Sequence, residues 1–121
     1  VIDGTYNASV DSMKSSIDVL ANYKKRKVAI LADMLELGDY SQQLHEEVGS
    51  YVASKGIDIL VCVGKEAKYI YQKAKENMKD VYYFESNQEV IARLDELLKE
   101  DDVILVKGSH SMNLKEVVEK I

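Results

Sequence analysis

A chain of 121 residues, 46% of them apolar, is long enough to form one domain over residues 1–121 with a core of its own. Its 16 basic and 21 acidic residues leave a net charge of −5, which argues against a nucleic-acid-binding surface because polyanions are bound by clustered Lys and Arg. The apolar runs reach about five residues, whereas a membrane span needs about 20. The single cysteine, Cys62, lies in one of these runs, which favours a buried thiol and a reducing, cytoplasmic location.

Strand and helix patterns alternate along the whole sequence. Residues 1–3 have the character of a strand end that leads directly into a polar turn, and we expect the chain to be part of a longer protein. Four short, continuous apolar runs are typical of strands buried on both faces of a parallel sheet: residues 28–31, 59–63, 81–84 and 103–106. Apolar residues at helical spacing flank these runs, in five sets that begin at Met13, Leu44, Ala67, Val90 and Leu114.

Local signals at the predicted helix ends agree with this pattern. Ser41 is placed to cap the second helix, and Ser86 with Glu89 has the spacing of a capping box before the fourth. Gly56 follows the second helix, where a left-handed residue is common. The alternation predicts an α/β fold: a Rossmann-like three-layer αβα sandwich around a mostly parallel sheet of about five to six strands.

Ligands of open parallel sheets bind beyond the carboxyl ends of the strands, in the loops and at the helix N-termini. The polar segment at residues 5–9 lies at such a place, immediately before a helix. From the residues alone, helix capping by Ser9 or Asp11 explains this segment as well as ligand binding does.

Three further loops follow predicted strands. Residues 33–38 carry two carboxylates, Asp33 and Glu36, which either present acids to a cation or belong to a packed loop with solvated acids; residue chemistry alone favours the packed loop. Lys65 follows a glycine but lacks the rest of a phosphate loop, so we expect a lysine at the surface or at a helix entry. Residues 107–111 offer a cation, a glycine, two hydroxyls and an imidazole, which suit either an anion cradle or a capping loop.

No nucleophile–base pair can be read from the sequence, so we assign no catalytic residue. The two histidines and the one cysteine are far apart, which argues against a zinc site. We expect His45, which follows Leu44 in the second helix, at the surface or at the boundary of the core.

Taken together, four of these segments resemble the C-terminal domain of the Mur ligases, in the branch that adds D-alanyl-D-alanine. The match runs from end to end in the order and spacing of that family, and its second and fourth segments are specific to the branch. The four segments are Tyr6-Asn7-Ala8-Ser9, Asp33-Met34-Leu35-Glu36-Leu37-Gly38, Val63-Gly64-Lys65 and Leu105-Val106-Lys107-Gly108-Ser109.

The resemblance implies a monomeric, cytoplasmic, three-domain enzyme of peptidoglycan synthesis whose third domain is this chain. Its substrates would be ATP, D-Ala-D-Ala and UDP-N-acetylmuramoyl-tripeptide, with ATP and magnesium bound mainly by a central domain. The tripeptide carboxylate would become an acyl phosphate that the dipeptide amine attacks. The third domain would close over ATP and help to place the dipeptide, and it would be inactive alone.

The same resemblance assigns functional positions, none of them a metal ligand. Gly4 stands where the family often has Asp, so Asp3 would have to supply that carboxylate. His110 stands where Arg is common, which argues against a permanent cationic clamp because imidazole is mostly neutral at pH 7. The positions form an ATP and hinge set (Asp3, Tyr6, Asn7, Ser9), an acidic loop facing the cleft (Asp33, Glu36) and a dipeptide-substrate loop (Lys107, Ser109, His110).

Two other classes of protein suit the residues without the resemblance. A stand-alone Rossmann-like module for a nucleotide or small ligand would bind its ligand as the isolated chain, whereas a ligase domain would bind weakly without its partner domain. A structural or regulatory interaction domain would instead bury one broad face.

Overall fold

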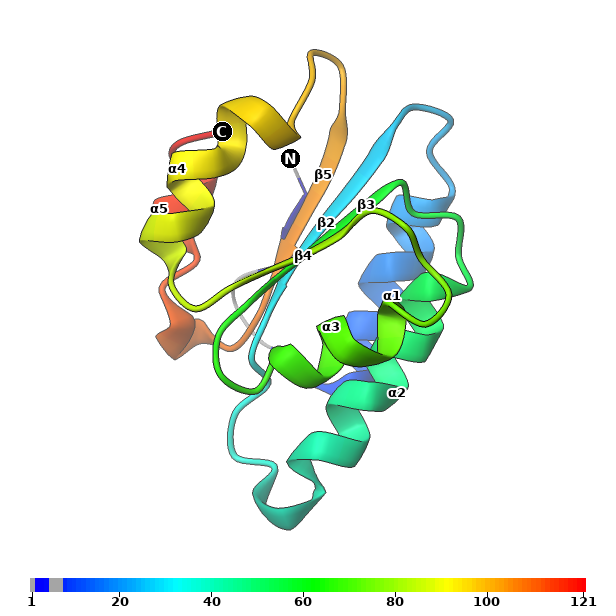
Figure 1. Cartoon of the computed structure of the whole chain (residues 1–121), viewed down its shortest axis with the longest axis vertical. Helices are drawn as coiled ribbons and strands as arrows, with labels where there is room; N and C mark the ends of the chain where they lie inside the picture. Colours follow the sequence, from blue (N-terminus) through cyan, green and yellow to red (C-terminus); the bar gives the residue numbers. More distant parts are fainter. Residues whose placement is uncertain (1, 5–7) are drawn as a thin grey trace.

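In the computed structural model, which describes residues 2–4 and 8–121, five parallel strands form one sheet between two layers of helices (Figure 1). The strand order is β1-β5-β2-β3-β4. The predicted three-layer α/β fold and the predicted number of strands are confirmed. The strands are β1 (Ile2–Gly4), β2 (Lys27–Ala32), β3 (Ile59–Val63), β4 (Val81–Phe84) and β5 (Val103–Lys107).

Three helices cover one face of the sheet and two cover the other (Figure 1). On the first face lie α1 (Val10–Ala21), α2 (Ser41–Ala53) and α3 (Lys68–Ala74), and on the second lie α4 (Asn87–Leu97) and α5 (Lys115–Val118). Two 3-10 turns, η1 (Gly38–Tyr40) and η2 (His110–Met112), precede α2 and α5. Within residues 2–4 and 8–121, none of the helices has the length and apolar character needed to cross a bilayer.

The strands are apolar on both sides because each side packs under a helix layer. Successive residues of a strand point to opposite faces, so Leu31 joins the cluster beneath α1–α3 while Ile30 joins the cluster beneath α4 and α5. Both side chains have no exposed surface. Continuous apolar runs therefore predicted the central strands correctly, since neither face of these strands meets water.

The strand order creates a switch point between the neighbouring strands β5 and β2. The chain leaves β2 toward α2 on one face, and it leaves β5 toward α5 on the other face. Loops that diverge in this way open a crevice at the carboxyl ends of the two strands, which is where open α/β sheets bind ligands.

Two of the predicted helix-end signals are confirmed and one is wrong. The Ser86 side chain accepts the Glu89 N–H, as predicted, although the Glu89 carboxylate accepts from the Glu85 N–H rather than closing the box on Ser86. Gly56 has a positive φ of 72°, as its place after α2 predicted. Ser41 does not cap α2: η1 runs directly into the helix, so Ser41 already has helical dihedrals and Tyr40 occupies the cap position.

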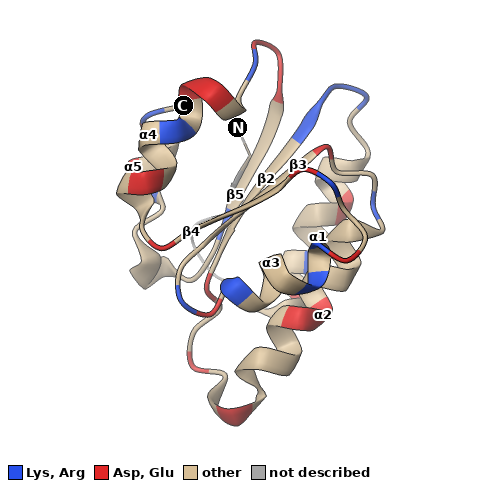
Figure 2. Cartoon of the chain, in the orientation of Figure 1, with Lys and Arg blue, Asp and Glu red and all other residues tan. Residues whose placement is uncertain are grey.

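The basic run at residues 24–27 forms the turn between α1 and β2 (Figure 2). Lys24 and Lys25 are exposed, as a solvated turn requires. Arg26 is partly buried, and its guanidinium donates to the Asp102 carboxylate (2.6 Å) and to the Leu97 carbonyl (3.2 Å). This ion pair ties the turn to the segment between α4 and β5.

Candidate functional site

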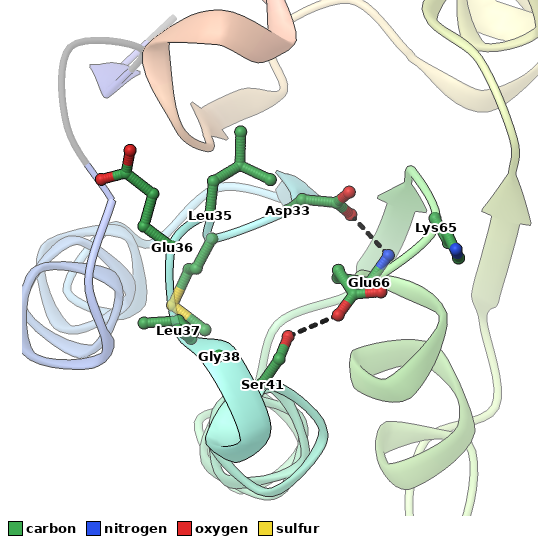
Figure 3. A pocket seen from close by; sticks show the side chains of 9 residues that line it. Asp33, Leu35, Glu36, Leu37, Gly38, Ser41, Lys65 and Glu66 are labelled. Carbon is green, nitrogen blue, oxygen red and sulfur yellow. Dashed lines mark hydrogen bonds between the residues drawn. The ribbon is translucent and has the colours of Figure 1, made fainter.

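Asp33 is the first residue after β2, and its side chain is only 5% exposed. Its Oδ1 accepts the N–H groups of Glu66 (2.9 Å) and Ala67 (2.7 Å), at the entry to α3 (Figure 3). Burial raises the pKa of this carboxyl above its ordinary value of 3.8, although the two N–H donors act in the opposite direction. Asp33 is therefore a buried acceptor that joins two loops, and not the solvated acid that its loop composition favoured.

Gly64 makes this contact with Asp33 sterically possible. A Cβ at position 64 would lie 2.5 Å from Asp33 Oδ1 and 2.8 Å from Met112 Cε, and the φ of 114° is one that only glycine adopts easily. The carbonyl of Gly64 also accepts the hydroxyl of Tyr83 (2.9 Å). The glycine thus lets the ends of β2 and β3 and the turn η2 meet.

The loop that carries Ser109 binds the acidic loop, residues 33–38, directly. The Ser109 N–H donates to the Asp33 carbonyl (2.9 Å), and its Oγ accepts the Leu35 N–H (2.8 Å). Two of the three predicted site segments, which are far apart in the sequence, are therefore in contact at the switch point. The Ser109 oxygen accepts from Leu35, and its hydroxyl hydrogen has no protein acceptor in the part of the chain that the structure describes.

Lys107 ends β5 and is buried, with 7% of its surface exposed. Alternation along β5 places its side chain on the same face as Leu105, the face covered by α1–α3. Burial lowers the pKa of its ammonium group, and no acceptor pairs with it among the groups that the structure describes, which do not include the side chains of residues 3 and 5–7. A buried cation without a partner is costly, so this position is suited to receive an anion.

A pocket of about 340 Å³ lies between the acidic loop, the start of α2 and the entry to α3 (Figure 3). Glu36, with a positive φ of 64°, is exposed at its rim, and the exposed Lys65 lies opposite. Met34 is fully buried beneath the pocket, whereas Leu35 is 37% exposed. Met34 is buried because the loop turns back on the core of the α1–α3 face.

The predicted ATP and hinge set lies mostly outside what the structure describes. This holds for Tyr6, for Asn7 and for the side chain of Asp3. Ser9 is described and caps α1: its side chain accepts the Ser12 N–H (3.2 Å), and the Ser12 hydroxyl in turn accepts the Ser9 N–H (2.8 Å). The remaining predicted residue, His110, is exposed and starts η2.

Within residues 2–4 and 8–121, no group of three or more His, Cys, Asp or Glu side chains is placed to hold a metal ion. Cys62 is fully buried, and burial raises the pKa of its thiol, so it serves as a core side chain rather than as a nucleophile.

His45 is the residue that the sequence analysis misplaced. It was expected at the surface or the boundary, yet it has no exposed surface, and its Nε2 lies 3.0 Å from the Met34 backbone nitrogen. A signal for its burial was present, because His45 precedes Val48 and Val52 by three and seven residues, the spacing of one helix face. The spacing does not reveal its partner, since Met34 lies in a separate loop.

Replacing Asp33 by asparagine is expected to stabilise the chain at neutral pH, because the amide oxygen can still accept both N–H groups without a buried charge. The raised pKa means that the folded protein holds the Asp33 proton more tightly than the unfolded chain does. Wild-type stability therefore falls as the pH rises from 3.8 through the folded pKa. In urea unfolding, the advantage of Asp33→Asn should appear between about pH 4 and pH 7 and vanish at lower pH.

Asp33→Leu is the matched variant, since it leaves the Glu66 and Ala67 N–H groups without an acceptor and should cost about 3 kcal/mol. An Asp33→Asn advantage that did not change with pH would contradict a buried, titrating carboxylate.

The sheet topology, with loops that meet at a switch point, defines the chain as an open-sheet α/β domain. The family model described as "Mur ligase, glutamate ligase domain" matches residues 1–110, and the chain belongs to this family. The predicted resemblance is thereby confirmed.

Two similar curated proteins carry the same enzyme name. The UDP-N-acetylmuramoyl-tripeptide--D-alanyl-D-alanine ligase of Escherichia coli (strain K12) is 37% identical over 120 residues, and that of Rickettsia prowazekii is 35% identical over 120 residues. In each case the match covers 98% of this chain and 26% of the relative. This chain therefore spans about a quarter of the length of these ligases.

Two solved structures share the fold over nearly the whole chain. MurF from Acinetobacter baumannii superposes with a TM-score of 0.86 at 28% identity, covering 94% of this chain and 26% of that one. The MurF ligase from Thermotoga maritima in complex with ADP gives a TM-score of 0.79 at 27% identity, covering 95% of this chain and 26% of that one.

Proposed function

We propose that this chain is the dipeptide-placing domain of a cytoplasmic, monomeric, ATP-dependent ligase that adds D-alanyl-D-alanine to UDP-N-acetylmuramoyl-tripeptide in peptidoglycan synthesis. Membership of the Mur ligase family and the shared name of the relatives support the reaction. The observation that carries the proposal to particular residues is the buried Lys107 at the switch point, which has no partner among the groups that the structure describes.

The dipeptide supplies the anion that Lys107 lacks. Its terminal carboxylate would accept from the Lys107 ammonium group and from the Ser109 hydroxyl, which can donate its hydrogen while its oxygen accepts the Leu35 N–H. Charge-assisted hydrogen bonds of this kind are about twice as strong as neutral ones. They would hold the dipeptide so that its amine faces the rest of the ligase.

Placement of the amine is the catalytic contribution that such a domain can make. Holding two reactants in a reactive geometry can replace about 7–11 kcal/mol of the barrier by prior ordering. Closure of a domain over the activated acid also keeps out water, which would otherwise hydrolyse it. The contacts of Ser109 with both Asp33 and Leu35 would keep the two loops in one geometry during closure.

ATP and magnesium belong to the proposed reaction, but the described residues offer little to hold either. Of the proposed nucleotide set, only the Ser9 side chain is described, and its oxygen accepts the Ser12 N–H. The Ser9 hydroxyl caps a helix, and the described residues contain no cluster of side chains that could hold magnesium. These features do not form a triphosphate site. We therefore assign both groups mainly to the part of the ligase that this chain does not span and derive no step through them.

The test uses the full-length protein that contains this chain. Purified enzyme is expected to join D-Ala-D-Ala to UDP-N-acetylmuramoyl-tripeptide with release of ADP and phosphate, followed by mass spectrometry and a coupled ADP assay. The isolated chain is expected to form no product. A full-length enzyme that did not accept the dipeptide would overturn the proposed reaction.

Ser109→Ala tests the placement of the dipeptide. Loss of a hydrogen bond to a charged group should raise KM for the dipeptide about tenfold or more. Ser111→Ala is the control, because Ser111 is exposed in the same loop. Equal dipeptide KM values in the two variants would remove Ser109 from the proposed site.

The alternative, a stand-alone small-ligand module, has one observation in its favour: the pocket of about 340 Å³ is lined by this chain alone. That reading predicts micromolar binding of a nucleotide or a dipeptide by the isolated chain in calorimetry. The ligase reading predicts that binding tightens only in the full-length enzyme.

A further inference from the structure

His45 lies in the core, on the face of α2 that also carries Val48 and Val52. Its ring has no exposed surface. A buried imidazole needs partners for both ring nitrogens, because an unpaired polar group in the core costs free energy. The identity of these partners indicates what the residue does.

Both ring nitrogens have backbone partners, and these fix the tautomer. Nδ1 lies 2.7 Å from the Ser41 carbonyl oxygen, which can only accept, so Nδ1 carries the hydrogen. Nε2 lies 3.0 Å from the Met34 N–H, which can only donate, so Nε2 offers its lone pair. The ring is therefore neutral in this geometry and joins the start of α2 to the acidic loop.

These bonds complete a ring of contacts beside the pocket, of which Figure 3 shows the bonds of Glu66 with Ser41 and with Asp33. The Ser41 hydroxyl donates to Glu66 Oε1 (2.6 Å), and the Glu66 N–H donates to Asp33 Oδ1 (2.9 Å). Asp33 precedes Met34, whose N–H returns to His45. The acidic loop is thus held from α2 at Met34 and from the entry to α3 at Asp33.

We propose that His45 is a positioning residue: its Nε2 lone pair fixes the Met34 backbone and so sets the direction of Asp33 and the shape of the pocket. The residue touches no substrate and acts through the loop. The expected effect of His45 on the turnover of the ligase rests on the proposed function. The expected effect of His45 on the conformation of the acidic loop does not.

Three variants separate the lone pair from the volume of the ring. His45→Gln keeps an acceptor at the distance of Nε2, and His45→Leu fills the core without one. Val48→Ala is the control, because Val48 is buried on the same face of α2 and packs in the core without a side-chain hydrogen bond. A variant that destabilises the core but leaves the hydrogen bonds of the loop intact should show the same exchange at Met34 as Val48→Ala does.

The first readout is amide hydrogen exchange at Met34 in this chain. Relative to Val48→Ala, with urea used to match global stability, His45→Leu should speed exchange at Met34 roughly tenfold, the factor for about 1.4 kcal/mol. His45→Gln should stay within roughly threefold of wild type. Equal exchange in His45→Leu and Val48→Ala, or no rescue by glutamine, would overturn the proposal.

The second readout needs no variant. The ¹⁵N chemical shifts of the wild-type ring should show Nδ1 protonated and Nε2 unprotonated. A ring protonated at Nε2 would overturn the proposal even if His45→Leu failed to fold.

The third readout applies to the full-length ligase. His45→Leu should raise KM for the dipeptide roughly tenfold over Val48→Ala with KM for ATP unchanged, and His45→Gln should restore it. If exchange at Met34 responds while the dipeptide KM does not, the loop-positioning role stands and its place in the proposed reaction is overturned. If the full-length protein is not a ligase at all, exchange and the ring shifts still decide the role of His45.

Discussion

Gly64→Ala is expected to destabilise the chain by about 3 kcal/mol. Two costs combine at this position: a strained backbone, about 1–3 kcal/mol, and overpacking against neighbours that cannot move freely. The new Cβ would lie 2.5 Å from Asp33 Oδ1, and Asp33 is held by two backbone N–H groups. Urea unfolding measures the loss.

Gly38→Ala is the matched control for the backbone term. Gly38 also has a positive φ, 59°, but a Cβ there would meet nothing within 4 Å. Its replacement should therefore cost only about 1 kcal/mol, the usual penalty for a left-handed residue. Equal losses in the two variants would mean that the contact between Gly64 and Asp33 does not matter.

Lys107→Met is expected to have the largest effect on function, with opposite signs for stability and activity. In the full-length ligase, loss of the ammonium group should lower kcat/KM for the dipeptide about 100-fold, because a buried charge pair would lose one partner. Without ligand, the same change should stabilise the protein by about 1 kcal/mol, since an unpaired buried cation is replaced by an apolar side chain of similar length.

The pH dependence gives a second check on Lys107. Burial lowers its pKa below the ordinary 10.5, so between these two values the unfolded chain binds more protons than the folded one, and stability rises with pH. The advantage of Lys107→Met should therefore be largest below the folded pKa of Lys107 and shrink as the pH rises toward 10.5.

Lys115→Met, at an exposed lysine that begins α5, is the control for Lys107 and should change stability by less than about 0.5 kcal/mol. If Lys107→Met destabilised the ligand-free protein, the ammonium group would already have a partner there, and this result would contradict the proposed anion site.

The sequence predicted which residues face the core far better than it predicted what the loop residues touch. Leu31 and Leu105 are buried, as the continuous apolar runs predicted, because a strand that is covered on both faces is apolar throughout. Ser41 and His45 were misjudged because their partners, Glu66 and Met34, lie in other segments. No local pattern encodes such a contact.

For this protein, the sequence alone determined the alternation of strands and helices, the three-layer sandwich and, through its loop motifs, the family. Only the tertiary structure decided the strand order and the contact of the acidic loop with Ser109, which is 74 residues from Leu35. It also decided the burial of Asp33, whose side chain accepts N–H groups 33 and 34 residues away. Hydrophobic periodicity is a local property that a short segment expresses by itself. Partners across a sheet edge are fixed only when distant strands pair, since their bonds depend on the register and order of the whole sheet.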